Sequence, residues 1–440
     1  MGMTYEDAVH LLHRASFGGT PEEFTACIQL GRQESVRRLL SGISLTDKPE
    51  ALVNFNLMTR EGRPGGKRPL TASRIYDQQQ YWLYLMVNTQ APLVEKMTLF
   101  WHGHFATAFY KVDDMLPMYQ QNVLFRQYAL GNFKELVQKI GKDPAMMFWL
   151  DMNRSKKEAP NENYSRELME LFTLGIGHYS EQDVKELARA FTGWRIINSQ
   201  ASFNANWYDP GVKTLLGTTG NLGYTEAVEI ILKQQAYPIF LATKLLKFFA
   251  TANPPSFWIE LVANSIRTKN TIGEVLQELF NSNEFYKQRY RKRLFKSPTE
   301  YVVSTFRALG LTINEHNSYL PAKSMGQELY NPPDVSGWDG GDSWLNSDRM
   351  VGRHQFASMI ARSMSDSKLN SSEFKPAQPS NPDDWLAMWC KRFGIGELSP
   401  STKTSLRSYA NDTVVNSSQP ITGMRGLMQL VLMSPESQMK

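Results

Sequence analysis

Residues 161–194 read NENYSRELMELFTLGIGHYSEQDVKELARAFTGW, and this stretch decides both the fold class and the first candidate site. Apolar residues recur at helical spacing over 164–174 and 181–192, and a Gly-rich turn joins the two patterns. A helix that only buries an apolar stripe does not need Asn, Glu, Arg, His and Trp so close to that stripe. The stretch therefore predicts two helices that form one wall of a polar pocket.

Helical spacing extends outward from this stretch over nearly the whole chain. The period fails between residues 196 and 216, where Asn, Asp-Pro and Gly turns predict one small β-hairpin. We therefore expect a mainly α fold, a multi-helix globular array with long irregular loops and that single hairpin. Further helices are predicted at 4–15, 21–31, 72–87, 92–104, 117–130, 133–140, 225–233, 238–250, 256–267, 272–280, 297–309 and 348–364.

The 440 residues divide at a segment rich in Ser, Asn and Pro. Residues 1–365 are predicted to form the main helical domain, and residues 366–383 a mobile linker. Residues 384–440 carry closing helices that we expect to pack on the main domain. A basic, Gly-rich segment at 62–69 predicts a flexible loop.

The composition argues against several classes of protein. The net charge of +5 comes from 48 basic and 43 acidic residues spread along the chain, so we expect no nucleic-acid partner. Since no run of 18 apolar residues occurs, we expect no transmembrane segment. The first residues show no signal peptide, although a trimmed export signal stays open and localisation is undecided. Cys27 and Cys390 are read as free buried thiols, with a bridge between them left open.

The first candidate chemistry lies on the helix that begins near residue 161. Helical spacing places Asn163, Glu167 and Glu170 on one face. Carboxylates can ligate a metal, or act as general acid and general base when their environments separate their pKa values. The structural alternative is a pair of exposed i,i+4 ion pairs, Glu162 with Arg166 and Arg166 with Glu170, each worth roughly 0.2–0.5 kcal/mol.

The second candidate is the segment FWHGHF, which carries His102 and His104. Positions i and i+2 do not share a helical face, so both rings could chelate one ion only from an irregular helix end, which Gly103 would permit. The alternative is that each ring is a hydrogen-bonded core residue packed against aromatic side chains.

The third candidate is the Pro- and Gly-rich loop that follows residue 326. Proline fixes its backbone and glycine permits tight turns, so the loop can hold a definite shape. Gln327, Asp334, Trp338 and Trp344 would suit recognition of a sugar or another polar ligand, and Arg353 could pair with an acidic ligand or with a Glu of the site. The alternative is a rigid loop whose Trp side chains fill the core.

Together these segments resemble a bacterial family known as domain of unknown function 1800. The matching motifs run in order from Val9 to Arg353 and are HLLHRASFG, KMTLFWHGHFAT, the stretch 161–194, KTLLG, KSPTEYVVSTFRALG and GQELYNPPDVSGWDGGDSWLNSDRM. One position departs from the family pattern, because Tyr208-Asp209 stands where a His-Asp pair is expected. The resemblance implies a mostly helical bacterial protein, frequently exported and often encoded beside a sulfatase-like partner, but it implies no established reaction.

Three hypotheses about function follow from these observations. The leading one is a hydrolase or lyase that acts on a glycan or another cell-envelope polymer by Glu/His acid–base chemistry. The second is a metal-dependent enzyme with a divalent ion between helices, and the third is a non-catalytic assembly or chaperone-like partner of a sulfatase-like protein. The proposed catalytic residues are Glu167, Glu170, His102 and His104, the same four being the proposed metal ligands, with His178 as a further candidate ligand. The proposed substrate-binding residues are Asn161, Asn163, Arg166, His178, Trp194, Gln327, Asp334, Trp338, Trp344 and Arg353.

Overall fold

Two helices, α4 and α15, lie at the centre of the molecule. All twelve residues of α15 (Pro298–Leu309) are buried, as are most of those in α4 (Pro92–His104). The computed structural model describes residues 2–46, 59–61, 67–69, 74–313 and 319–440. In this part of the chain the fold is mainly α, as expected, with helices α1 to α21 and three two-stranded antiparallel sheets.

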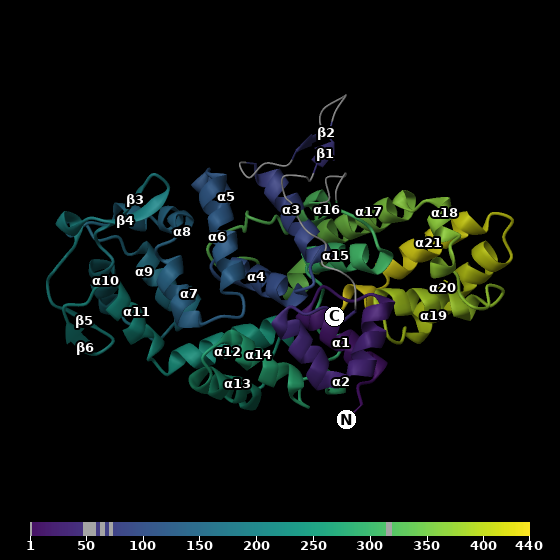
Figure 1. Cartoon of the computed structure of the whole chain (residues 1–440), viewed down its shortest axis with the longest axis horizontal. Helices are drawn as coiled ribbons and strands as arrows, with labels where there is room; N and C mark the ends of the chain where they lie inside the picture. The colour runs from purple at the N-terminus through teal and green to yellow at the C-terminus, as the bar shows by residue number, and fades with distance from the viewer. Residues whose placement is uncertain (1, 47–58, 62–66, 70–73, 314–318) are drawn as a thin grey trace.

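The molecule is elongated, and its elements follow the chain from the centre to one end, back along one side and out to the other end (Figure 1). The first helices are α1 (Tyr5–Ala15), α2 (Pro21–Ser41), α3 (Ile75–Asn88), α4, α5 (Phe109–Val112), α6 (Met115–Gln127), α7 (Phe133–Ile140) and α8 (Pro144–Trp149). The next are α9 (Asn163–Glu167), the π-helical turn η3 (Leu168–Thr173), α10 (Glu181–Ala190), α11 (Tyr224–Leu232), α12 (Ala236–Phe249), α13 (Ser256–Thr268) and α14 (Ile272–Asn281). The last are α15, α16 (Tyr319–Ser324), α17 (Ser347–Ser363), α18 (Asp366–Leu369), α19 (Pro382–Phe393), α20 (Pro400–Ala410), the π-helical turn η8 (Asn411–Val415) and α21 (Pro420–Met433). Short 3₁₀ turns are η2 (Met152–Arg154), η4 (Ala205–Trp207), η5 (Gln288–Tyr290), η6 (Gly341–Leu345), η7 (Ser372–Phe374) and η9 (Pro435–Gln438).

Local sequence explains where many helices begin. Thr4, Thr20, Ser180, Thr271 and Ser297 each form a capping box with an acidic residue three positions later. The hydroxyl and the carboxylate satisfy two backbone N–H groups that the first helical turn leaves without an intrahelical partner.

The β-structure is limited to hairpins. The region of the expected hairpin does form hairpins, but there are two where one was expected at 196–216, and the first, which pairs β3 (Trp194–Ile197) with β4 (Gln200–Phe203), begins two residues earlier. Its turn residues Asn198 and Ser199 both have positive φ, as a tight two-residue hairpin turn requires. A second hairpin pairs β5 (Lys213–Leu215) with β6 (Thr218–Gly220), and β1 (Thr59–Glu61) pairs with β2 (Lys67–Pro69). The loop predicted at 62–69 lies outside the described residues, apart from the three residues of β2.

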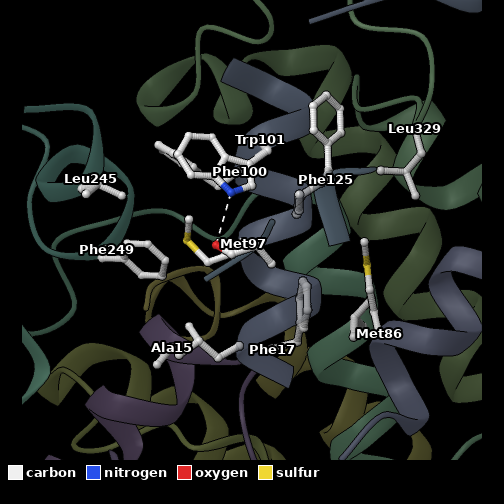
Figure 2. Close-up of a cluster of buried hydrophobic side chains, with 14 of the residues drawn as sticks. Ala15, Phe17, Met86, Met97, Phe100, Trp101, Phe125, Leu245, Phe249 and Leu329 are labelled. Carbon is white, nitrogen blue, oxygen red and sulfur yellow. Dashed lines mark hydrogen bonds between the residues drawn. The ribbon is translucent and has the colours of Figure 1, made fainter. Parts of the chain in front are cut away.

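Aromatic and aliphatic side chains from helices distant in sequence form the core. Met97, Phe100 and Trp101 of α4 meet side chains of α1, α3, α6 and α12 (Figure 2). The indole N–H of Trp101 donates to the carbonyl oxygen of Ala129 at 3.2 Å, which satisfies the one polar atom of this buried ring. Since four helices pack around α4, the positions of its polar residues are tightly fixed.

The C-terminal helices contact the rest of the chain directly. Helix α21 packs against α17, and α19 packs against α15. Between them, residues 366–383 hold α18 and η7, whose Leu369 and Phe374 are fully buried. That this segment is mobile stays a prediction. Among the described residues, no helix has the length and apolar character needed to cross a membrane.

Candidate functional site

The opening stretch of the candidate site folds as one short α-helix that continues into a π-helical turn. Helix α9 carries Glu167 at its last position, and η3 carries Glu170. Leu168, Met169 and Phe172 are buried beneath them, while the two glutamates are half-buried. π-Helical turns are rare and frequently occur at functional sites. The predicted helix is therefore present, but with a wider turn than the sequence pattern indicates.

Glu167 and Glu170 have different environments. The hydroxyl of Tyr179 donates to Oε2 of Glu170 at 2.6 Å, which fixes the direction of that carboxylate. Burial, and then the nearby charge of Glu170, raise the pKa of Glu167 above its usual value. Burial and the bond to Glu170 raise the pKa of Tyr179, so its hydroxyl stays protonated as a donor at neutral pH. Two carboxylates in unequal environments are the arrangement required for separate acid and base roles.

Arg166 does not bind Glu170, which corrects the ion pair expected from helical spacing. Its guanidinium instead forms a bidentate pair with Glu181 of α10 at 2.7 and 2.8 Å. The other expected pair, Glu162 with Arg166, is present at 3.3 Å. The physical reason is that α10 packs against α9, so a carboxylate from a second helix competes for the same guanidinium.

The two asparagines of the motif shape the start of α9. The side-chain oxygen of Asn161 accepts the backbone N–H of Asn163 at 2.9 Å, as in an Asx turn. The Asn163 amide donates to Asp151 at 3.3 Å, and Lys111 donates to the same Asp151 oxygen at 3.2 Å. Asn163 is exposed and Asn161 half-buried, so Asn163 remains available to a ligand.

The Gly-rich turn after η3 projects from the surface. Gly175 and Gly177 both have φ near +86°, and between them Ile176 is 78% exposed. His178 is also exposed and follows directly. Trp194 belongs to a different surface, because its ring packs against Phe203 at 5.3 Å in the β3–β4 hairpin.

His102 holds the backbone of the loop after α16. Its Nε2 accepts the N–H of Tyr330 at 3.0 Å, so this nitrogen carries no proton in the neutral ring. The ring is buried between Trp82, at 5.3 Å, and Trp338, at 5.5 Å. Burial lowers the pKa of His102 to about 3, so the ring is neutral at physiological pH.

His104 points into an aromatic cluster on the other side of α4. Its Nε2 lies 3.0 Å from the carbonyl oxygen of Phe172 and therefore donates to it, since a carbonyl oxygen only accepts. Rings of Phe105 and Phe133 enclose it, and burial lowers its pKa to about 3. The ring thus binds the backbone of η3 rather than a carboxylate of Glu167 or Glu170.

The predicted metal site is therefore not assembled. Across residues 2–46, 59–61, 67–69, 74–313 and 319–440, no three His, Cys, Asp or Glu side chains form a group that could hold a metal ion. His102 and His104 face opposite sides because positions i and i+2 are about 200° apart around a helix, and α4 stays helical through His104. Both rings are buried and hydrogen-bonded to backbone atoms, so neither forms a hydrogen bond to Glu167 or Glu170.

The Pro- and Gly-rich loop docks on the end of α4. Gly337 has φ +86°, and a Cβ built there would lie 2.4 Å from the carbonyl oxygen of Gly103. Ser336 donates its backbone N–H, at 2.8 Å, and its hydroxyl, at 2.6 Å, to Oδ1 of Asp334. Asp334 is exposed and Trp338 half-buried, so these two predicted binding residues remain at the surface.

The other predicted binding residues of this region are buried and connect separate elements of the fold. Gln327 is buried and its side-chain oxygen accepts the N–H of Thr299 at 2.9 Å. Trp344 is buried, and Arg353 donates to Lys296 O and to Gln438 Oε1, both at 2.7 Å. In this conformation a ligand cannot reach them, because all three side chains are buried.

Helix α5 joins the loop to α9, a connection that the sequence did not reveal. The N–H of Phe109 donates to Tyr330 O at 2.8 Å, and the N–H of Tyr110 donates to the side chain of Asn331 at 3.0 Å. Tyr110 is 62% exposed and its ring contacts Trp149 at 5.4 Å. Tyr110, Lys111 and Asp151 were not predicted, since they lie outside the motifs and only tertiary contacts relate them; Tyr179 lies inside the stretch 161–194, but its bond to Glu170 is not evident from sequence.

Asp209 has a structural partner. It accepts from Arg189 at 2.7 Å, and its backbone N–H donates to Thr192 at 2.8 Å. Tyr208, at the position where the family resemblance implied a His, donates to the carbonyl oxygen of Leu222 at 3.2 Å. These bonds fix the segment between the two hairpins against α10.

Comparison with known proteins identifies the chain at the level of a family. The family model described as "Protein of unknown function (DUF1800)" matches residues 10–439. The chain belongs to this family. No curated protein and no solved structure matches the DUF1800 chain. The family description carries no activity, so function is argued from the site itself.

Proposed function

We propose that this DUF1800 protein is a hydrolase or lyase that acts on a glycan or another cell-envelope polymer. The observation that supports this proposal is the pair of half-buried carboxylates, Glu167 and Glu170, at the junction of α9 and a π-helical turn. Tyr179 orients one carboxylate, while burial and the neighbouring charge raise the pKa of the other. In this proposal both the general acid and the general base are glutamates, and neither His102 nor His104 takes part in the reaction.

Each carboxylate has a defined role in the proposal. Glu167, with the raised pKa, gives its proton to the oxygen of the bond that breaks. Glu170, held by Tyr179, accepts a proton either from an attacking water in a hydrolase or from a sugar carbon in a lyase. The surface groups Asn163, Asp334 and Trp338 would contact the polymer on either side.

The test is turnover of a polysaccharide panel, measured as new reducing ends and as new unsaturated products. Glu167→Gln and Glu170→Gln should each lower the rate by at least about 100-fold, because acid–base groups contribute 10²–10⁴-fold. Glu162→Gln is the matched control, since Glu162 pairs with Arg166 on the same helix and should leave the rate unchanged. Equal activity of all three variants, or no turnover and no binding of any polymer by the wild-type protein, would overturn the proposal.

A separate observation favours a second candidate, a non-catalytic partner of a sulfatase-like protein. Ile176 in the Gly-rich turn is 78% exposed, the largest exposed fraction among the large hydrophobic residues of the described chain, and burying this side chain against a partner would be favourable. Under this reading the buried polar motifs only stabilise the fold. Replacing Ile176 with Asp should abolish co-purification with the sulfatase-like protein, whereas Ile43→Asp, at another exposed isoleucine, should not. Unchanged co-purification of the Ile176 variant would contradict this role.

A further inference from the structure

A hollow of about 930 Å³ lies on the surface between α7 and the start of α11, at the end of the molecule that also carries strands β3 to β6 (Figure 1). Its lining includes Lys134, Lys139 and Lys142 together with two acids, Glu135 and Glu229. Tyr128 supplies an aromatic side chain to the same lining. None of these residues belongs to the Glu167–Glu170 pair, so the hollow requires its own explanation.

Two aromatic rings fix the position of the Lys142 ammonium group, which loses part of its hydration there. Its Nζ lies 4.8 Å from the centre of the Trp194 ring and 4.7 Å from that of Tyr224. The preceding Gly141 is required, because a Cβ there would lie 2.0 Å from the Tyr224 hydroxyl. Lys142 is half-buried, and its ammonium group gains cation–π attraction in place of part of its hydration.

The lysines of the hollow differ in how their charge is balanced. Lys134 forms an ion pair with Glu229 at 2.8 Å. Within the part of the chain that the structure describes, no ion pair joins Lys139 or Lys142 to a carboxylate. Glu226 attracts Lys142 from a greater distance, but its Oε2 accepts the backbone N–H of Gly223 at 3.2 Å. Two cations therefore remain for an external anion.

The positions of Lys139 and Lys142 limit the shape of an anion that both can bind. Lys139 and Lys142 are three positions apart at the end of α7, and the Nζ of Lys139 lies 5.8 Å from the Tyr128 ring centre. A ligand with separated negative groups and a flat apolar face between them could meet both ammonium groups and the ring of Tyr128.

We propose that this hollow is a binding subsite for an acidic glycan, with Lys139 and Lys142 receiving carboxylate or sulfate groups of successive sugars. The subsite is joined to the candidate catalytic helix, since the hydroxyls of Tyr224 and Tyr164 of α9 are 3.4 Å apart. The inference rests on the proposed function for its ligand class, a cell-envelope glycan, and it specifies that this glycan is anionic.

Binding without turnover tests the inference by itself. Oligogalacturonate and a neutral cello-oligosaccharide of the same length are titrated into the Glu167→Gln full-length protein, and binding is measured by calorimetry at two salt concentrations. The acidic oligosaccharide should bind at least 10-fold more tightly than the neutral one, and added salt should weaken its binding. Equal affinity for both, or tighter binding of a single-stranded RNA competitor, would overturn the assignment.

Lysine variants test whether the acidic oligosaccharide binds in this hollow. In the same Glu167→Gln background, Lys139→Gln should weaken oligogalacturonate binding at least threefold, and Lys139→Gln with Lys142→Gln at least 10-fold. Lys185→Gln, at an exposed lysine of α10 outside the hollow, is the matched control. Should Lys142→Gln unfold the protein, the exposed Lys139 decides the question alone, and unchanged affinity of its variant refutes the subsite. Binding that persists while the wild-type protein turns over no glycan would keep the subsite and reject only the catalytic proposal.

Discussion

At the scale of single residues, the polar side chains that made the sequence look catalytic divide into two groups. His102, Gln327 and Arg353 are buried and bind backbone or side-chain groups of other elements. Glu167 and Glu170 stay half-buried at the surface. Burial thus separates residues that hold motifs together from residues that a ligand can reach, and side-chain chemistry alone does not make that distinction.

Gly337 provides a prediction at this scale. Gly337→Ala should lower the free energy of unfolding by roughly 3 kcal/mol, since the new Cβ combines left-handed backbone strain with a clash against the Gly103 carbonyl. Urea unfolding measures the loss. Gly217→Ala is the matched control, because Gly217 has φ +80° but nothing within 4 Å of the added Cβ, so only strain of about 1 kcal/mol is expected. Equal losses in the two variants would mean that the loop does not dock on α4 as described.

At the scale of elements, short and irregular pieces position the candidate site. The four residues of α5 connect the loop after α16 to the start of α9 through hydrogen bonds at both ends. The π-helical turn η3 then brings Glu170 within reach of Tyr179. Long helices with regular apolar spacing, such as α12, supply the packed surface behind them. The site therefore depends on the elements for which sequence periodicity is least informative.

At the scale of the whole molecule, one buried charge cluster joins distant parts of the chain. The Glu300 carboxylate of α15 receives the ammonium groups of Lys96 from α4 and of Lys440. Lys96 also donates to the carbonyl oxygen of Ser16 after α1, at 2.9 Å. Lys296 is buried close by and adds a further positive charge. Burial, partly offset by the attraction of Glu300, lowers the pKa of Lys296 to about 7.

This lowered pKa predicts a dependence of stability on pH. The ordinary lysine pKa is 10.5, so between about pH 7 and 10.5 the unfolded chain binds more protons at Lys296 than the folded chain. The free energy of unfolding should therefore rise with pH in this window, by at most about 1.4 kcal/mol per pH unit from this group. Urea unfolding of wild type and Lys296→Met at pH 7, 8 and 9 measures it. The variant should show a shallower rise, with the exposed Lys185→Met as control; identical slopes in all three proteins would contradict the prediction.

The sequence by itself determined the fold class, the family and the places where many helices begin. Helical spacing of apolar residues and Ser/Thr caps are local signals, and they act within a few residues along the chain. They predicted α9 and α10, the turn residues predicted a hairpin within 196–216, and the motifs around them led to the family that matches residues 10–439.

Only the tertiary structure decided which polar residues meet. His102 and His104 were grouped with Glu167 and Glu170 because all four could perform the same chemistry, yet α4 turns the two rings into separate buried environments. Conversely, Asp151 and Lys142 became candidates only through contacts with residues distant in sequence, Lys111 and Trp194. Local propensity fixes an element and its faces, whereas the packing of those faces against one another fixes burial, pKa and distance, and with them what a side chain can do.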